Sequence, residues 1–288
     1  MSKSATAAEC SLGALFVHPV KSCAGIAVRE SLLVETGLDL DRAWMVVDPH
    51  GEMLTQRDMP RLALVQPTLR HSDLVLRAPG MLAMHIRLDT VEEPARVRVW
   101  DDIVKAYDMG ALAAQWFSDF LGRKVRLARF DPEEKRLSAA QWTGALQAEN
   151  AFADAFPLLV LGSATLADLN TRLAAQGLAP VTMQRFRPNL VLDGLQPGDE
   201  DHIHELDIAT DEGLVTLRLV KPCSRCSIPN VDPASGETSN QPGDTLASYR
   251  ADARVEGAVT LGMNAVVVKG FDCTLRVGQR AALRWNFD

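Results

Sequence analysis

The sequence predicts an α+β protein, mainly β, built from barrel-like sheets with a few covering helices. Three observations lead to this prediction. Short β-branched or alternating runs, separated by turn residues, occupy most of the first hundred residues. Only two stretches have a strong helical pattern. Strands and helices do not alternate regularly, as a doubly wound sheet would require.

The N-terminal part reads mostly as strand. Its predicted strands are LFVHPV (15–20), SLLVET (31–36), RAWMVVD (42–48), LALVQ (62–66), DLVLR (73–77), AMHIRL (83–88) and VRVW (97–100). Residues 48–51 predict a hairpin loop, because Pro49 presets one dihedral angle and Gly51 permits a positive φ. The first helix is predicted over residues 110–121, GALAAQWFSDFL. A boundary between two parts is predicted near residues 105–125.

The second part contains the clearest helix, residues 163–176. Ser163 is placed to cap its start and Gly177 to end it. One face carries leucines, namely Leu166, Leu169 and Leu173. Strands are predicted on both sides of this helix: VRLARF (125–130), NLVLD (189–193), ELDIA (205–209), LVTLRLV (214–220), AVVVK (265–269) and LRVGQRAALRW (275–285).

The composition is that of a soluble globular protein, with 47% hydrophobic and 23% charged residues. No apolar run reaches the roughly 18 residues that span a bilayer. Residues 1–10, MSKSATAAEC, have neither the basic region nor the apolar core of a signal peptide. We therefore expect a cytoplasmic protein.

The charge and the cysteine count exclude further classes. A formal net charge of −7 argues against general attraction to nucleic acid or to an anionic membrane, though not against a local basic pocket. Five cysteines, an odd number in 288 residues, argue against a secreted disulfide framework.

Two thiols in CxxC spacing, Cys223 and Cys226, lie in the stretch KPCSRC (221–226). A structural zinc site needs about four ligands, usually in two paired clusters. The nearest histidines, His202 and His204, lack the spacing of a zinc finger and no second CxxC follows, which disfavours zinc. A thioredoxin-like pair sits where a strand meets a helix. Here the predicted strand runs into the loop SIPNVDPASGE, so a redox disulfide stays open but lacks its usual setting.

A third interpretation uses the cations beside these thiols. Lys221 and Arg225 favour the thiolate form of a neighbouring cysteine, and a thiolate is the form that binds a soft metal. The alternative is that both cysteines are small buried hydrophobic residues, a common fate of cysteine. The stretch by itself leaves these interpretations open.

Basic residues gather beside loop-forming residues although the chain is acidic overall. Eight cations occupy five short stretches: Lys21, Arg42, Arg57, Arg61, Arg185, Arg187, Lys221 and Arg225. Arginine offers a planar fork of donors that suits phosphate or another oxyanion. If the fold brings these loops together, they form an anion pocket around the cysteines. Two or three of the eight are expected to be ordinary surface cations.

Five ordered segments resemble the MOSC family. They are HPVKSCAG, DRAWMVVD…TQRDMPRLALV, FRPNLV, VKPCSRCSIPNVDPASGE and LGMNAVV…LRVGQ. The chain is similar to the two-part type, which has an N-terminal β-barrel-like domain ahead of the MOSC β-barrel domain. That group includes the mitochondrial amidoxime-reducing components and bacterial proteins that detoxify N-hydroxylated bases. The resemblance covers nearly the whole chain and implies a division into residues 1–122 and 123–288.

The resemblance implies a molybdenum cofactor (Mo-molybdopterin), to which a protein cysteine adds one sulfur ligand. The matching cysteine is Cys226, expected to be both metal ligand and catalytic centre, and a soft thiolate suits a metal already held by sulfur. The residues expected to bind the cofactor are Lys21, Ser22, Arg42, Arg57, Arg187, Asn189, Ser224, Arg225, Asp232 and Asn264. Asp232 has an alternative role as a turn former before Pro233.

One stretch departs from the family pattern. Some relatives carry Thr-Ser before the proline and apolar strand that precede the second helix, whereas this chain has Ala155-Phe156-Pro157. The lost hydroxyls leave one phosphate contact to backbone N–H groups.

The implied function is reduction of N-hydroxylated small molecules such as amidoximes, hydroxylamines and N-hydroxy bases. The chain has no clustered cysteines of an appended ferredoxin domain, so electrons are expected from a separate ferredoxin or flavoprotein reductase. No nucleic acid or membrane partner is expected. The alternative is a cofactor or sulfur (persulfide) carrier without reductase activity, because MOSC domains also form the C-terminal part of molybdenum-cofactor sulfurases.

Overall fold

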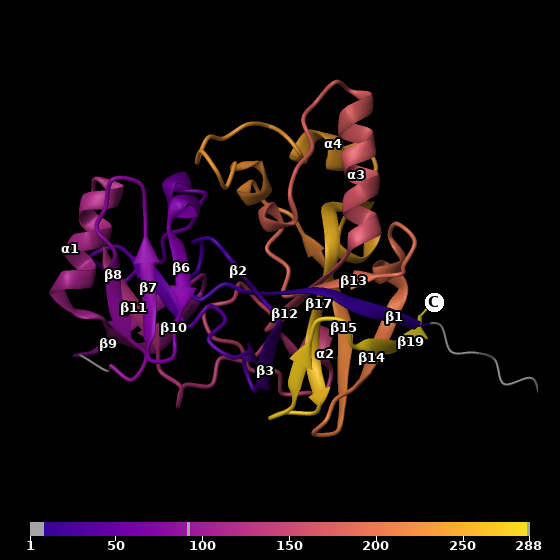
Figure 1. Ribbon diagram of the computed structural model, residues 1–288, viewed down its shortest axis with the longest axis horizontal. Coiled ribbons are helices and arrows are strands. Elements are labelled where there is room, and N and C mark those ends of the chain that lie inside the picture. The colour runs from indigo at the N-terminus through magenta and orange to yellow at the C-terminus, as the bar shows by residue number, and fades with distance from the viewer. Residues whose placement is uncertain (1–8, 91–92, 287–288) are drawn as a thin grey trace, which may run out of the picture.

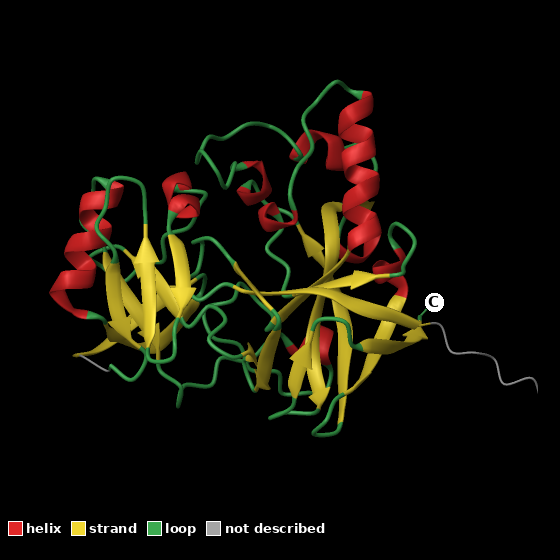
Figure 2. Cartoon of the chain, viewed as in Figure 1, coloured by secondary structure: helices red, strands yellow, loops and turns green. Residues whose placement is uncertain are grey.

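The computed structural model describes residues 9–90 and 93–286, and its secondary structure is mainly β with few helices (Figures 1 and 2). The larger body, on the right of Figure 1, is strand-rich and carries two helices at its top. The smaller body, on the left, holds the sheets of the N-terminal part and one long helix. Residues 1–8, for which no signal peptide is predicted, lie outside the described residues.

Seven strands of the larger body close into a barrel. In ring order they are β12 (Leu158–Gly162), β13 (Leu190–Asp193), β1 (Glu9–Val17), β19 (Arg280–Trp285), β14 (Ile203–Ala209), β15 (Leu214–Ser224) and β17 (Ala258–Lys269). The antiparallel pairing of β12 with β17 closes the ring and sets Leu158 opposite Ala265. Two short strands pair at its edges, β2 (Ile26–Val28) with β1 and β16 (Ala251–Asp252) with β17. Fully buried leucines such as Leu12 and Leu217 fill the barrel, and their burial supplies its main stabilisation.

The smaller body contains two sheets. One has the order β5 (Trp44–Val47), β11 (Arg126–Phe130), β10 (Asp102–Asp108) and β9 (Glu93–Val99); the other has the order β6 (Gln66–Leu69), β7 (Asp73–Arg77) and β8 (Met84–Arg87). Helix α1 (Gly110–Leu121) buries Trp116, Phe117 and Phe120 in the same core cluster as Leu74 of β7.

The sheets connect distant parts of the chain. A third small sheet joins β18 (Thr274–Arg276) to β3 (Glu30–Val34) and β4 (Gly37–Leu38). The N-terminal strand β1 lies in the barrel between β13 and β19, while β11 lies in the N-terminal sheet between β5 and β10. Hydrogen-bonded strands therefore cross the proposed division at residues 122 and 123, which stays a prediction.

The helices are few, as predicted. Besides α1 they are α2 (Ala140–Thr143), α3 (Ser163–Ala175) and α4 (Gly243–Ala247), with 3-10 turns at Pro60–Leu64 (η1), Met183–Arg185 (η2), Asp199–His202 (η3), Ile228–Asn230 (η4) and Ala253–Val255 (η5). Helices α1 and α3 confirm the two helices predicted over residues 110–121 and 163–176. The fold class, mainly β with barrel architecture and a few helices, is confirmed.

Three local predictions were wrong, and one turn was right. The stretch 62–66 is not a strand, because Pro60 opens η1 and the strand begins at Gln66. Ser163 is the first helical residue rather than the cap, and its hydroxyl hydrogen-bonds Asp193 of the neighbouring strand. The long run at 275–285 is two strands, β18 and β19. The turn before Gly51 forms as predicted, with Gly51 at φ 85°.

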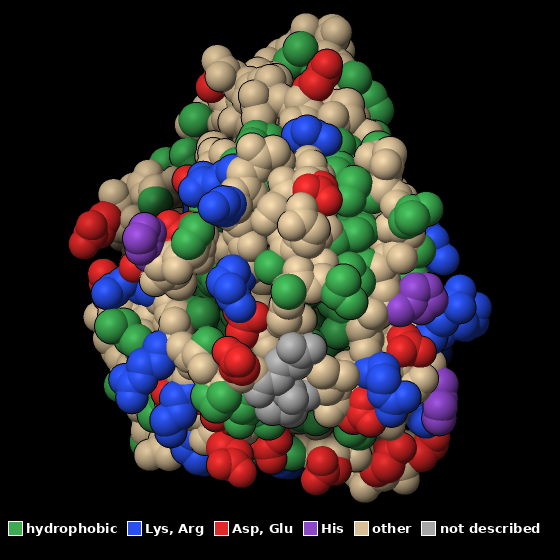
Figure 3. All heavy atoms as spheres, turned by 90° about the vertical axis from the view of Figure 1, so that its left-hand side faces the viewer, with side chains coloured by type: hydrophobic (Ala, Val, Ile, Leu, Met, Phe, Trp, Pro, Cys, Tyr) green, Lys and Arg blue, Asp and Glu red, His purple; other side chains and the backbone are tan. Residues whose placement is uncertain are grey.

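The surface over the smaller body carries both signs of charge (Figure 3). Basic and acidic side chains are interspersed on this face, and acidic groups gather along its lower edge. None of the helices within the described residues is both long and apolar enough to cross a membrane.

Candidate active site

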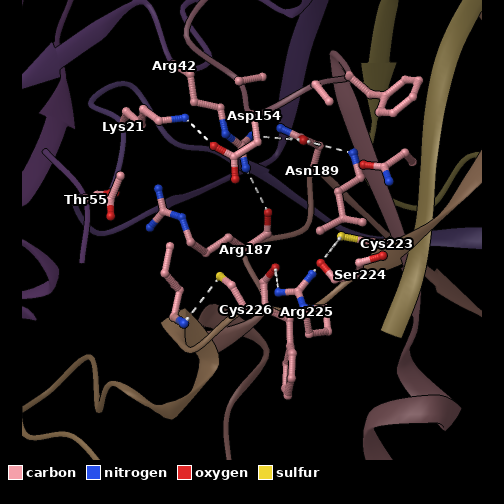
Figure 4. A pocket seen from close by; sticks show the side chains of 18 of the residues that line it. Lys21, Arg42, Thr55, Asp154, Arg187, Asn189, Cys223, Ser224, Arg225 and Cys226 are labelled. Atoms are coloured by element: carbon pink, nitrogen blue, oxygen red, sulfur yellow. Dashed lines mark hydrogen bonds and ion pairs between the residues drawn. The ribbon is translucent and has the colours of Figure 1, made fainter. Parts of the chain in front are cut away.

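One pocket gathers residues that are far apart in the sequence, where loops of the N-terminal part meet the end of the barrel (Figure 4). The predicted site residues Lys21, Ser22, Arg42, Arg57, Arg187, Asn189, Ser224, Arg225, Cys226 and Asn264 all line it. Asp232 does not line it. The fold thus brings both CxxC sulfurs and most of the predicted basic loops to one place.

Five of the eight predicted cations line the pocket: Lys21, Arg42, Arg57, Arg187 and Arg225. The other three have other partners. Arg61 lies 4.6 Å over the ring of Phe120, Arg185 is 2.8 Å from Asp232, and Lys221 lies 5.2 Å from the ring centre of Trp142. The pocket is therefore a strongly positive concavity in an acidic protein.

The backbone of the pocket wall adopts conformations that ordinary residues rarely use. Ser22, Arg42 and Arg187 have positive φ angles of 67°, 49° and 58°. A non-glycine residue pays for such a conformation, and these residues hold it because their surroundings fix it. Clustering of three such residues in one pocket is typical of functional sites.

Arg42 is fixed by a buried network. Its Nη1 bonds Asp41, and also Asn189 at 3.0 Å, while its Nη2 donates to the backbone oxygen of Arg187 at 3.0 Å. Asn189 is 1% exposed, and its amide also bonds the backbone of Leu159 and Phe16. Asn189 therefore acts by positioning Arg42 and joining β1 to β12.

Two ionisable groups behind Arg42 titrate far from their ordinary range. Burial, with repulsion from Arg187 and Arg42, lowers the pKa of His18 to about 3, so this imidazole is neutral. Burial raises the pKa of Asp41, but the charge of Arg42 and a hydrogen bond from His18 outweigh that effect and hold the pKa at about 2. The pair is thus a neutral imidazole beside a carboxylate that balances Arg42.

Lys21 and Asp154 form the second ion pair of the pocket. Lys21 Nζ donates to Asp154 and, at 2.7 Å, to the backbone oxygen of Phe152. Burial lowers the pKa of Lys21, while Asp154 opposes that shift. Burial raises the pKa of Asp154, but Lys21 and Arg57 reverse the effect and leave its pKa below the ordinary range. Asp154, with a side chain 53% exposed, thus places a carboxylate at the solvent side of the pocket.

Three guanidinium nitrogens of the pocket lack partners. Arg57 Nη1, Arg187 Nη2 and Arg225 Nε are buried and have no hydrogen-bond partner within the part of the chain that the structure describes. A buried charged donor without a partner costs free energy, about 1–3 kcal/mol or more. An anionic ligand in the pocket would satisfy such donors.

The two cysteines stand at the end of β15, with Cys223 on the strand and Cys226 beyond it. Cys223 Sγ accepts a hydrogen bond from Arg225 Nη1 at 3.1 Å, and Arg225 Nη2 donates to the backbone oxygen of Phe186 at 2.8 Å. Cys226 is exposed, and the Ile228 N–H lies 3.5 Å from its sulfur. Both thiols are free. The short turn η4, rather than an α-helix, follows them, so the usual setting of a thioredoxin-like pair is missing.

No group of three or more His, Cys, Asp or Glu side chains converges to chelate a metal ion among residues 9–90 and 93–286. A single protein thiolate can bind a soft metal that other ligands already hold.

The remaining predicted residues divide in two. Asn264 of β17 lines the pocket, and its amide donates to the backbone oxygen of Lys221 at 3.2 Å. Asp232 instead accepts from the backbone N–H groups of Ala234 and Ser235 and pairs with Arg185. This is the turn-forming role that was its alternative.

Sequence reasoning missed several pocket residues. Thr55, Asp154 and Phe156 line the pocket and were not among the predicted site residues. Phe156 belongs to the stretch 155–157 that departs from the family pattern, and Asp154 comes directly before that stretch. The departure at an expected phosphate contact was therefore a signal that these residues lie near the site. His18 and Asp41 flank predicted basic residues, but nothing in their types marked them as partners.

Comparison with known proteins agrees with this architecture. Residues 10–124 match the family model of the MOSC N-terminal beta barrel domain, and residues 147–281 match that of the MOSC domain. The chain is 36% identical over 248 residues to mitochondrial amidoxime reducing component 2 of Rattus norvegicus, covering 82% of this chain and 71% of that protein. The chain belongs to the MOSC family. The family predicted from five segments is thereby confirmed.

Two other MOSC proteins are similar to the chain. Mitochondrial amidoxime-reducing component 1 of Homo sapiens is 36% identical over 246 residues, covering 82% of this chain and 71% of that protein. Molybdenum cofactor sulfurase of Bos taurus is 28% identical over 283 residues, covering 92% of this chain but 31% of that protein. This MOSC chain is therefore similar both to proteins named as reducing components and to a part of a much longer sulfurase.

Proposed function

We propose that this MOSC protein is a molybdenum-cofactor-dependent reductase of N-hydroxylated small molecules: amidoximes, hydroxylamines and N-hydroxy bases. One observation carries the proposal. Cys226, an exposed thiol, lines the same pocket as five cations, and three of those cations have buried nitrogens without partners in the described structure. The relatives named amidoxime-reducing components supply the substrate class.

The residues present fit such a cofactor by their chemistry. An anionic pterin phosphate suits the unpartnered guanidinium donors of Arg187 and Arg225, and a sulfur-ligated metal suits one added thiolate. Cys226 would supply that sulfur. Lys21, Ser22, Arg42, Arg187, Ser224, Arg225 and Asn264 would surround the cofactor, with Asn189 holding Arg42 in place. When bound, the cofactor would supply two-electron reduction of the N–O bond.

The protein's own residues would then orient and charge-balance the site. The hydrogen bonds that fix Arg42 and Arg187 hold these side chains in position before any ligand arrives, which avoids reorganisation during the reaction. Asp154 directs Lys21 and keeps a carboxylate at the solvent side, where it balances part of the positive charge of the pocket. The electrons would come from a separate ferredoxin or flavoprotein reductase. The proposed compartment is the cytoplasm, although the named reducing components are mitochondrial.

An activity assay tests this proposal. The protein is purified from molybdate-fed cells, supplied with a reductase, and assayed for benzamidoxime reduction. Wild type is expected to reduce benzamidoxime, and Cys226→Ser to lose at least 100-fold in rate, on the order of the loss when an essential catalytic group is removed. Cys273→Ala, which changes a thiol buried in the barrel core, serves as the matched control and is expected to stay active. Full activity in Cys226→Ser would refute the ligand assignment.

A sulfur carrier is the second candidate, favoured by the exposure of Cys226 and by the sulfurase relative. In that role Cys226 or Cys223 would hold a persulfide and pass its outer sulfur to a client. Intact-mass spectrometry of fresh protein separates the two candidates. A sulfane sulfur adduct without molybdenum favours the carrier, and a bound pterin favours the reductase.

A further inference from the structure

Arg57 is held differently from the other arginines of the pocket. Arg42, Arg187 and Arg225 each donate to a backbone oxygen, at Arg187, Cys23 and Phe186 respectively. The Arg57 guanidinium instead lies 3.8 Å from Asp154 and 4.8 Å over the ring of Trp100. A guanidinium stacked on a ring keeps its N–H groups free to donate, whereas in one bonded to backbone oxygens some N–H groups are already hydrogen-bonded.

The backbone that carries Arg57 is rigid. Thr55 bonds the Asp58 carboxylate through its N–H at 3.2 Å and through its hydroxyl at 3.1 Å, and the Arg57 N–H donates to the Thr55 hydroxyl at 3.1 Å. The Gln56 amide donates to the backbone oxygen of Ser22 at 2.7 Å. The base of the Arg57 side chain is therefore fixed to the pocket wall, while its head is set by Trp100 and Asp154.

Trp100 is itself an unusual residue. It sits in the tight turn between β9 and β10 with φ 56°, a conformation that is a genuine outlier for a bulky side chain. It is 44% exposed, although a large aromatic ring is normally buried. Backbone strain and the exposure of a large ring both destabilise the folded state. Their presence at Trp100 points to a contact that this side chain makes. That contact is the stack on Arg57.

We propose that Arg57 is the substrate-contacting arm of the pocket and that Trp100 is its positioning residue. Resemblance to the family groups Arg57 with the cofactor-binding residues, but its contacts favour the opposite side of the pocket. Its side chain is 25% exposed, compared with 7% for Lys21 and 13% for Arg42, and it neighbours the half-exposed Asp154. The solvent side is where a small substrate enters, while the deeper cations face the cofactor.

The substrate chemistry fits this arm, and the inference rests on the proposed reductase function. The N–OH group of an amidoxime or N-hydroxy base presents oxygen and nitrogen lone pairs. The buried Nη1 of Arg57, which lacks a partner in the described residues, can donate to one of them. Through this hydrogen bond the Arg57 guanidinium would bind and orient the N–OH group.

Three substitutions test the arm. Trp100→Asn removes the ring and suits the left-handed backbone, so the turn should still form. Trp100→Phe keeps an aromatic face, and Arg57→Lys keeps the charge but loses the planar fork. Ile103→Asn is the matched control, because Ile103 is an apolar residue of the same hairpin that is 54% exposed.

Steady-state kinetics with benzamidoxime and assays of bound molybdenum and pterin give the readouts. Trp100→Asn and Arg57→Lys are expected to raise KM about tenfold, as expected when a hydrogen bond from a charged group is lost. Their kcat and cofactor content should stay within about twofold of wild type. Trp100→Phe should recover most of the KM, and Ile103→Asn should match wild type. Loss of cofactor from Trp100→Asn or Arg57→Lys, or an unchanged KM, would overturn the inference.

Failure of the proposed function is separable from failure of this inference. If wild type holds the cofactor but does not reduce benzamidoxime, the reductase proposal falls, and calorimetric titration of the holoprotein with benzamidoxime decides the arm. Binding about tenfold weaker in Trp100→Asn than in wild type supports it. Equal binding, or no binding to wild type, overturns it.

Discussion

Several pocket side chains are fixed by partners that lie far away in the sequence. Lys21 bonds Phe152, which lies 131 residues away, and Arg42 bonds Asn189, 147 residues away. Arg187 bonds Cys23, 164 residues away. Such long-range contacts make each cation depend on the whole fold, because the same side chains in an unfolded chain would be hydrated and mobile. Their positions are a consequence of folding rather than of local sequence.

His18 makes the stability of the folded protein depend on pH in a predictable way. Its pKa of about 3 in the folded state lies below the ordinary 6.5, because burial and two arginines disfavour the imidazolium. The unfolded chain therefore binds a proton between pH 6.5 and pH 3 that the folded chain does not, so stability falls as the pH falls through this window. At pH 5 the loss from this one group is about 2 kcal/mol.

Urea unfolding at pH 7 and pH 5 measures this effect. His18→Gln lacks the titrating group and should lose about 2 kcal/mol less than wild type between the two pH values. Asp41 does not interfere, because its own pKa of about 2 moves its contribution to lower pH. An identical pH dependence in both proteins would contradict the buried neutral imidazole.

At the residue scale, the sequence predicted the basic residues of the pocket better than the acidic residue that balances their charge. Eight cations were predicted from their place beside loop-forming residues, and five of them line the pocket: Lys21, Arg42, Arg57, Arg187 and Arg225. Their neutralising partner Asp154 was not picked out. An isolated carboxylate in a loop looks the same whether it meets solvent or a buried lysine.

At the scale of elements, the predicted helices formed because their apolar period was long and clear, with Leu169 and Leu173 buried on one face of α3. Short runs were less reliable. Residues 62–66 read as a strand, yet Pro60 opens a 3-10 turn over them, since its fixed φ suits a first turn. The closing strand pair of the barrel was also invisible, because pairing between β12 and β17 depends on contacts about a hundred residues apart.

Strand β17 depends on a glycine where it closes the barrel. Gly262 has φ 77°, and a Cβ there would lie 2.7 Å from the backbone oxygen of Val160 on β12. Gly257 has the same φ, but a Cβ there would meet nothing within 4 Å. Gly262→Ala should therefore destabilise the protein by about 1–3 kcal/mol more than Gly257→Ala, since only the first adds overpacking to backbone strain.

Thermal and urea unfolding of the two glycine variants would measure this difference. Both substitutions share the cost of a left-handed alanine, so the comparison isolates the contact between β17 and β12. Equal destabilisation of the two variants would show that the barrel accommodates the added methyl group at Gly262 with no further loss of unfolding free energy.

At the scale of the whole molecule, the order of strands in the sheets shows that the two parts of the chain are structurally joined. Strand β1 fills the barrel between β13 and β19, although it comes from the N-terminal end. A fragment of residues 123–288 would leave those two strands with unpaired edges, which are costly and prone to aggregation. We expect this fragment not to unfold cooperatively by circular dichroism.

Adding back the missing strands is the control for the fragment. Co-expression with residues 9–38, which carry β1 to β4, should recover a cooperative transition. A cooperative transition in the fragment alone would mean that the barrel closes without β1. The sequence could suggest two parts from a change in strand and helix content, but it could not show that they exchange strands.

Convergence of distant loops was likewise beyond the sequence, which offered basic residues and two thiols without their arrangement. The fold places Cys226 beside the cations and leaves three guanidinium nitrogens unsatisfied within the described structure. The most direct measurement is the molybdenum and pterin content of protein purified from a molybdate-fed host. Wild type and Cys273→Ala should carry both, and Cys226→Ser should lose the molybdenum. Wild type without any pterin, or Cys226→Ser with as much molybdenum as wild type, would contradict the account.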